Sequence, residues 1–132
     1  MIKHEQKFCT ELKKWLCHNF KETCFIEAKI STGNKPFNLK SGFKEHQIPT
    51  LLMIKNGSFG YKISDMDCMT KPFDIIFSYK VKSYVAIHWV RRGNKKFYFI
   101  DPVTIQGVID DGIKSITEER AAVLAELTNE LC

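Results

Sequence analysis

Three runs of aromatic and β-branched residues between residues 73 and 101 constrain this chain most, because they predict three strands. The runs are FDIIFSYK, SYVAIHWV and KKFYFID, and this composition over seven or eight residues is typical of strands. The connections YKVKS and RRGNKK are basic and turn-like. Two earlier strands are expected, from Cys24 to Ser31 and from Phe59 to Ile63.

Helical patterns surround these strands. Residues 2–20 have apolar side chains at spacings of three and four, which indicates an amphipathic helix. A second helix is expected from about His46 to Asn56, with Pro49 in its first turn and Gly57 after its end. A last helix opens with Ser115 and Glu118 as a capping box and has four inward-facing residues, namely Ala121, Leu124, Leu127 and Leu131.

The order helix, strand, helix, strands, helix predicts a mixed α/β (α+β) sandwich in one domain over residues 1–132. No apolar run approaches the twenty residues that a membrane span needs. The charged start MIKHEQKF does not resemble a signal peptide. Five cysteines without a CxxC motif predict neither a disulfide framework nor a four-cysteine zinc site, so we expect a cytoplasmic protein.

The strand FIEAKIST carries an acid and a base two residues apart. Alternation along a strand places Glu27 and Lys29 on one face, while Ile26, Ala28 and Ile30 point the other way into the core. One interpretation is a solvated face with a weak ion pair. The other is one wall of a polar site, and features further along the chain favour it.

Three further polar positions accompany this pair. Gln47, next to His46, stands at the start of an apolar helix, and Asp74 begins the apolar run after KPF. Asp65 lies where the strand YKIS ends. Capping and turn roles are the alternatives for these residues. Together with Glu27 and Lys29 they form the set of groups that phosphodiester hydrolysis with Mg²⁺ requires, because carboxylates bind the hard cation and a lysine neutralises charge on the phosphate.

The stretch FIEAKIST…FNLKSGFKEHQIPTLL resembles the PD-(D/E)xK nuclease superfamily, and within it the RecU-type Holliday junction resolvases and their phage relatives. The resemblance covers residues 24–56 well and the later strands more loosely. It implies a restriction-endonuclease-like central mixed sheet flanked by helices, and a metal site for Mg²⁺ or Mn²⁺. It assigns catalytic roles to Glu27, Lys29, Gln47 and Asp74, with Glu27, Asp74 and Asp65 as candidate metal ligands.

The order of the acids departs from the family pattern. The aspartate of the PD half-motif normally precedes ExK, whereas here Asp74 follows Glu27. Either the strand order is permuted, so that the aspartate-bearing strand comes from the C-terminal half, or Asp65 or Asp74 reaches the site from a different strand. An acid on the first helix often joins such sites, and Glu5 and Glu11 are both candidates.

The net charge of +5 favours a phosphate-bearing partner. Candidate contacts with DNA flank the proposed site and a predicted turn, and they are Lys35, Lys40, Lys44, Arg91 and Arg92. The alternative for the turn residues is that they keep a sheet edge soluble.

The resemblance therefore predicts a Mg²⁺-dependent endonuclease acting on duplex or branched DNA, such as Holliday junctions, during recombination or phage replication. A homodimer is expected, in the cytoplasm, or in the host-cell cytoplasm if the chain is phage-encoded. The alternative is a catalytically inactive nuclease fold that serves as a DNA-binding or protein-interaction module. No glycine-rich phosphate loop or cofactor motif supports a small-molecule enzyme.

Overall fold

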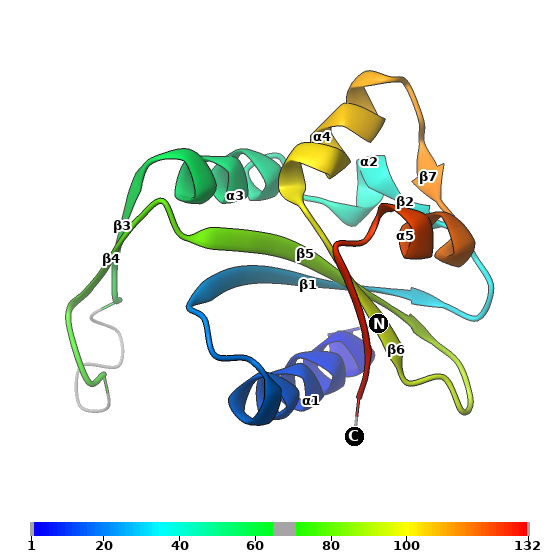
Figure 1. Ribbon diagram of the computed structural model, residues 1–132, viewed down its shortest axis with the longest axis horizontal. Helices are drawn as coiled ribbons and strands as arrows, with labels where there is room; N and C mark the ends of the chain where they lie inside the picture. Colours follow the sequence, from blue (N-terminus) through cyan, green and yellow to red (C-terminus); the bar gives the residue numbers. More distant parts are fainter. Residues whose placement is uncertain (1, 65–70, 132) are drawn as a thin grey trace.

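A four-stranded mixed sheet forms the centre of the protein in the computed structural model, which describes residues 2–64 and 71–131. Its strands are β1 (Cys24–Thr32), β5 (Lys82–Val90), β6 (Lys96–Ile100) and β8 (Leu127–Glu130), in the order β1-β5-β6-β8. β1 runs parallel to β5, and the other neighbours are antiparallel. The expected mixed α/β fold is confirmed, and β1, the strand of the ExK motif, lies at a sheet edge (Figure 1).

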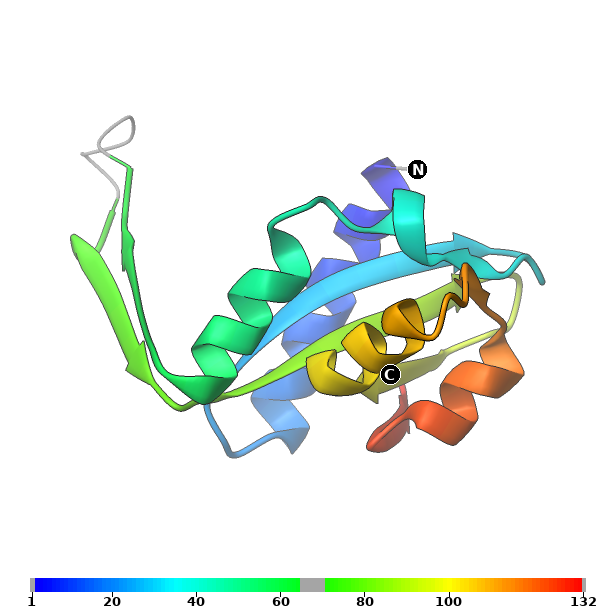
Figure 2. The same cartoon turned by 90° about the horizontal axis from the view of Figure 1, so that it is seen from above.

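Helices cover both faces of this sheet. On one face lies α1 (Ile2–Asn19), and on the other lie α3 (Gln47–Asn56), α4 (Pro102–Asp110) and α5 (Glu118–Leu124) (Figures 1 and 2). On β5, Tyr84 and Ala86 pack towards α1, while Val85, Ile87 and Trp89 pack towards the other helices. A strand buried on both faces has no polar alternation, which explains the continuous run SYVAI.

Two short strands add buried residues to the core on the face covered by α3, α4 and α5. β2 (Phe37–Asn38) pairs antiparallel with β7 (Ser115–Ile116), and both Phe37 and Ile116 are buried. The short helix α2 (Leu39–Gly42) follows β2, because the Asn38 side chain accepts hydrogen bonds from the N–H groups of Lys40 and Ser41. This compact turn holds the chain that leads into α3.

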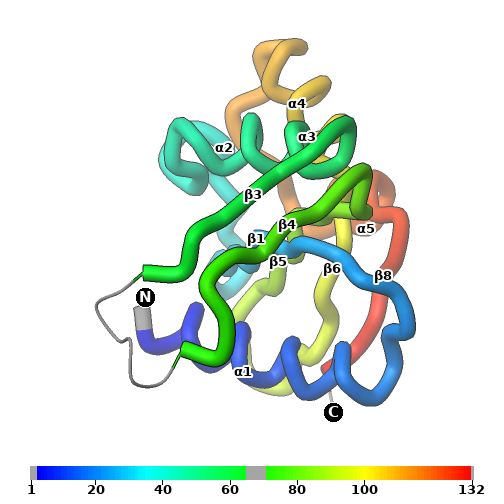
Figure 3. The backbone as a smooth tube through the Cα atoms, turned by 90° about the vertical axis from the view of Figure 1, so that its left-hand side faces the viewer, coloured from blue at the N-terminus to red at the C-terminus, as the bar shows by residue number. Residues whose placement is uncertain are grey.

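A separate two-stranded ribbon leaves the body after α3. β3 (Ser58–Lys62) pairs antiparallel with β4 (Ile75–Tyr79), and neither strand joins the central sheet (Figures 1 and 3). A permuted strand order in which the strand after Asp74 enters the central sheet is therefore wrong. As a result Ile75, Phe77 and Tyr79 are exposed on one face of the ribbon instead of entering the core.

Most elements expected from the sequence are confirmed, including α1, β1, α3 with Pro49 in its first turn, β5 and β6. The Gly57 N–H donates to the carbonyl of Met53 at the end of α3. None of the helices in the described part of the chain has both the length and the apolar character needed to cross a membrane.

The prediction for the end of the chain is wrong in two respects. The cap of α5 is Thr117, not Ser115, and the helix ends at Leu124 instead of continuing through Leu131. Residues Leu127–Glu130 form β8 because the open edge of β6 offers backbone hydrogen bonds to an extended segment. Helix α4, capped by Asp101 with a proline directly after it, was not expected.

Candidate functional site

The ExK strand presents its polar side chains to the face covered by α3. Phe25 packs against the core beneath α3, while Ile26, Ala28 and Ile30 pack beneath α1, so the expected alternation along β1 is confirmed. The face is nevertheless not solvated, because only 8% of Lys29 is exposed. The interpretation of Glu27 and Lys29 as an exposed surface pair is therefore wrong.

Glu27, Lys29 and Gln47 form one polar cluster. The Glu27 Oε1 atom lies 3.5 Å from Lys29 Nζ and accepts a hydrogen bond from Gln47 Nε2 at 3.0 Å. Gln47 is the first residue of α3, and its Oε1 accepts a hydrogen bond from the backbone N–H of Lys44 at 2.9 Å. The side chain of Gln47 is thus held at both ends, which fixes the orientation of the Glu27 carboxylate.

An aromatic ring completes the environment of the lysine. Lys29 Nζ lies 5.6 Å from the centre of the Phe43 ring, within the range of a cation–π interaction. Sequence reasoning missed Phe43, because it lies in the connection between α2 and α3, where no periodic pattern marks a side chain as inward-facing. The surrounding stretch SGFKEHQ contains no motif that would mark Phe43 as part of a site.

A cleft of ≈ 290 Å³ opens beside this cluster. Glu27, His46, Gln47 and Thr50 line its polar part, and the side chains of the ribbon and the neighbouring core line the rest. The Glu27 side chain is 31% exposed, so its carboxylate is accessible from the cleft while its partner lysine is not. This arrangement suits a cationic ligand that approaches the Glu27 carboxylate from outside.

The structure does not bring Asp74 to this cleft. Its side chain is 79% exposed and pairs with Lys71 Nζ at 3.1 Å, and its carbonyl accepts a hydrogen bond from the N–H of Ile63 at the end of the ribbon far from α3. Asp65, also proposed as a ligand, lies outside the described residues. Within residues 2–64 and 71–131, no three His, Cys, Asp or Glu side chains form a metal-binding group.

The two acids proposed from helix α1 are Glu5 and Glu11. Burial raises the pKa of the Cys9 thiol, and the negative charges of Glu5 and Glu27 raise it further. No hydrogen bond or ion pair joins Glu5 or Glu11 to the ExK cluster in the described part of the chain. Glu11 instead lines a different cavity, together with His88 and the β5–β6 turn.

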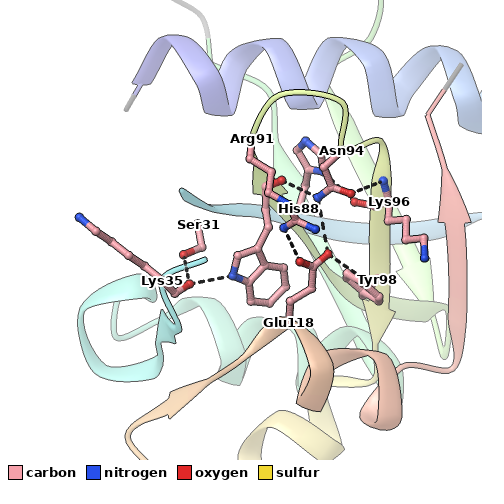
Figure 4. A network of polar contacts seen from close by, with 9 residues as sticks. Ser31, Lys35, His88, Arg91, Asn94, Lys96, Tyr98 and Glu118 are labelled. Atoms are coloured by element: carbon pink, nitrogen blue, oxygen red, sulfur yellow. Dashed lines mark hydrogen bonds and ion pairs between the residues drawn. The ribbon is translucent and has the colours of Figure 1, made fainter. Parts of the chain in front are cut away.

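The basic residues proposed to contact DNA fall into two groups. The side chains of Lys35, Lys40 and Lys44 are exposed along the segment that leads from β1 through α2 to Gln47. The backbone carbonyl of Lys35 accepts hydrogen bonds from Ser31 Oγ and Trp89 Nε1, both at 2.8 Å, so this segment is tied to the sheet (Figure 4). Arg91 and Arg92 lie at the β5–β6 turn, distant in sequence from Gln47.

Arg91 is committed to a structural contact. Its guanidinium pairs with Glu118, which also accepts a hydrogen bond from the Tyr98 hydroxyl at 2.8 Å (Figure 4). Burial would raise the pKa of Glu118, but the hydrogen bonds from Arg91 and Tyr98 outweigh it, and the pKa of Glu118 is lowered. Sequence reasoning missed this network because its members come from the β5–β6 turn, β6 and α5, which only the fold brings together.

No protein-family model, no curated protein and no solved structure matches this chain.

Proposed function

We propose that this protein is a metal-dependent DNA endonuclease of the PD-(D/E)xK type, built around Glu27, Lys29 and Gln47. The observation that carries the proposal is Lys29, which is 8% exposed and lies 3.5 Å from Glu27 at the edge of a cleft. Lysines are almost never this buried unless they are paired. A buried ion pair adds little stability, so a pair kept beside a cleft is better explained by chemistry.

The residues of the chain divide the work. Glu27 Oε1 is bonded to Gln47 and lies beside Lys29, whereas Oε2 forms no hydrogen bond with the described residues. That oxygen is the hard kind of ligand that Mg²⁺ or Mn²⁺ prefers. A bound cation would supply Lewis acidity and lower the pKa of its water. Lys29 would neutralise charge developing on the phosphate, and Gln47 would hold the carboxylate in place.

A second carboxylate would come from Glu5, Asp74 or Asp65. Glu5 stands on α1, which covers the opposite face of the sheet from Glu27, so it would have to reach the site around the β1 edge. Asp74 stands on a ribbon that pairs with no strand of the central sheet, so it would take part only if the ribbon bent towards the cleft.

DNA would lie along the basic segment beside the cluster. Lys35, Lys40 and Lys44 are exposed there, and the backbone N–H of Lys44 is the group that holds Gln47. Contacts of this kind bind phosphates without reading bases. The substrate that we propose is therefore chosen by its shape, as duplex or branched DNA such as a Holliday junction.

A cleavage assay on duplex and four-way-junction DNA with Mg²⁺ or Mn²⁺ tests the assignment. Glu27→Gln and Lys29→Met should each lower the cleavage rate by at least ~10²-fold, a typical loss when one such group is removed. Matched controls are Asp111→Asn and Lys114→Met, which change exposed residues of the same charges away from the cleft. Circular dichroism and thermal melting verify that each variant is folded. Wild-type rates in both cluster variants would show that the site is wrongly assigned.

We further propose a homodimer. A four-way junction is resolved by two cuts, and each chain carries a single Glu27 cluster. Light scattering of the protein alone and with junction DNA measures the mass of the complex. Two chains per junction are expected, and a single bound chain per cleaved junction would contradict the dimer.

A second candidate function is a nuclease fold that binds DNA without cutting it. The favouring observation is that the Glu27 carboxylate already pairs with Lys29 and accepts a hydrogen bond from Gln47. Calorimetric titration with Mn²⁺ separates the two candidates. Binding that is lost in Glu27→Gln supports the nuclease, whereas DNA binding with neither Mn²⁺ binding nor cleavage supports the binding module.

A further inference from the structure

A second cavity lies on the other face of the sheet, between α1 and the turn that joins β5 to β6. Its volume is ≈ 350 Å³, within the range of small-ligand sites. His88 forms part of its wall and belongs to the face of β5 that packs towards α1, whereas Glu27 belongs to the face covered by α3. The cavity is therefore separated from the ExK cluster by the sheet itself.

The lining of this cavity is strongly basic. Six of its side chains are basic, namely His4, Lys7, His88, Arg91, Arg92 and Lys95, and Glu11 is the single acid that lines it. Arg91 is neutralised by Glu118. Lys7, Arg92 and Lys95 form no ion pair with any of the described residues. These three cations outnumber the one acid of the cavity, so the concave space has a positive potential that an anion would relieve.

A buried histidine forms part of the wall. His88 is 8% exposed, and its ring stacks on Phe8 with 5.2 Å between ring centres. Its Nδ1 lies 2.7 Å from the carbonyl oxygen of Lys96, and because a carbonyl only accepts, Nδ1 carries the hydrogen. The other ring nitrogen, Nε2, bonds to no group in the described part of the chain. Figure 4 shows the ring on the side of β5 that faces α1.

The turn that carries Arg92 and Lys95 is held in one conformation. The Asn94 side chain donates to the Trp89 carbonyl at 2.7 Å and accepts from the Lys96 N–H at 3.2 Å. The Asn94 N–H donates to the Arg91 carbonyl at 3.1 Å, and Gly93 supplies the positive φ of 80° that the turn needs. Figure 4 shows Asn94 at the centre of this network. A ligand that binds here would not have to order the turn, which favours binding.

From this geometry we infer that the cavity is a binding site for a phosphate monoester, carried either by a free nucleotide or by the 5′ end of a nucleic-acid strand. A monoester is a dianion with a single substituent, so it can enter a concave site between a helix and a turn. A backbone diester carries chain on both sides and suits an open groove instead. Arg92 provides a planar fork for two phosphate oxygens, and Lys7 and Lys95 add compact charges.

Isothermal titration of the full chain tests this site, in buffer without phosphate. The probes are inorganic phosphate, thymidine monophosphate against thymidine, and a short thymidine oligomer with and without a 5′-phosphate. Binding of the phosphorylated member of each pair at least ~10-fold tighter is expected. If the free monophosphate binds as tightly as the phosphorylated oligomer, the nucleotide is the ligand; if the oligomer binds more tightly, the strand end is. Equal affinity for the oligomer with and without its phosphate, or no saturable binding of any probe, would overturn the proposal.

Variants localise the binding. Arg92→Gln combined with Lys95→Gln should weaken binding of the monophosphate at least ~10-fold, while the matched pair Lys13→Gln with Lys14→Gln, on the exposed side of α1, should leave it unchanged. All four positions are exposed, so folding is not at risk. Equal loss in both pairs would show that net charge and not this cavity binds the probe, which overturns the site. Glu27→Gln should bind the monophosphate as the wild type does, so this result is independent of the cleavage assay.

Discussion

At the level of single residues, Glu118 connects three other side chains through its carboxylate. Its carboxylate accepts from Arg91, from the Tyr98 hydroxyl and, at 3.5 Å, from Asn94. Burial together with the hydrogen bond to Glu118 raises the pKa of Tyr98 to about 12. One side chain thus joins α5 to β6 and to the β5–β6 turn.

We predict that Glu118 makes stability depend on pH. Because its folded pKa lies below the ordinary glutamate value of about 4.3, its contribution is present above that value and disappears as the pH falls through the folded pKa. Glu118→Gln should cost about 1–2 kcal/mol in the free energy of unfolding at pH 7, and this difference should shrink towards pH 3. Urea unfolding at both pH values measures it.

The control for this prediction is the neighbouring residue. Glu119 is exposed, so Glu119→Gln should change the free energy of unfolding by less than about 0.5 kcal/mol at either pH. A Glu118→Gln variant whose deficit is as large at pH 3 as at pH 7 would mean that Glu118 acts through packing and not through its charge.

The residues of the ExK cluster could be predicted from sequence, whereas the remaining acids could not. Glu27 and Lys29 share a face because strands alternate, and Gln47 follows from the start of an apolar helix. Both signals are local. Which strand lies beside β1 is not local, and the ribbon that carries the segment after Asp74 pairs only with itself. The contacts of Glu118 depend equally on the assembled fold.

At the level of elements, α5 is a short helix whose start is set by one side chain. Thr117 has extended backbone angles, and its hydroxyl accepts from the Arg120 N–H at 3.2 Å. Thr117→Ala should therefore cost about 1 kcal/mol in the free energy of unfolding. Ser115→Ala should cost clearly less, because Ser115 is exposed in β7. Chemical denaturation of both variants decides between them, and a larger loss for Ser115→Ala would restore the capping box inferred from sequence.

The boundary between α5 and β8 shows why local patterns mispredict chain ends. Apolar residues continue at helical spacing from Ala121 to Leu131, so sequence alone extends the helix. In the folded chain the edge of β6 that does not face β5 has backbone N–H and C=O groups in need of partners. Leu127–Glu130 provides these partners by pairing with β6 as a strand. Leu131 still becomes buried, but beneath α1 together with Phe8 and Phe97. The predicted burial of Leu131 is therefore correct, although the predicted helix that was to bury it is wrong.

At the level of the whole molecule, the sheet separates two polar sites that both suit phosphates. The ExK cluster and the lysines that flank it lie at the β1 edge under α3, while the basic cavity lies under α1. A DNA duplex bound at the cleft would meet Lys40 and Lys44, and would leave the exposed lysines of α1 in solvent.

The salt dependence of DNA binding tests this division of charge. Each phosphate contact contributes about 0.9 to the slope of log K against log salt concentration. Lys40→Gln combined with Lys44→Gln should therefore make this negative slope less steep by about 1.8. Fluorescence anisotropy on a duplex at several salt concentrations measures it. Lys13→Gln combined with Lys14→Gln removes the same charge from the outer side of α1 and should leave the slope unchanged. Equal changes in both pairs would mean that the total charge attracts the DNA. If the slope changes only in the Lys40 and Lys44 variant, the DNA backbone must run past α2 and the start of α3. That path would bring a phosphodiester to Glu27, because Gln47 at the start of α3 is bonded to its carboxylate.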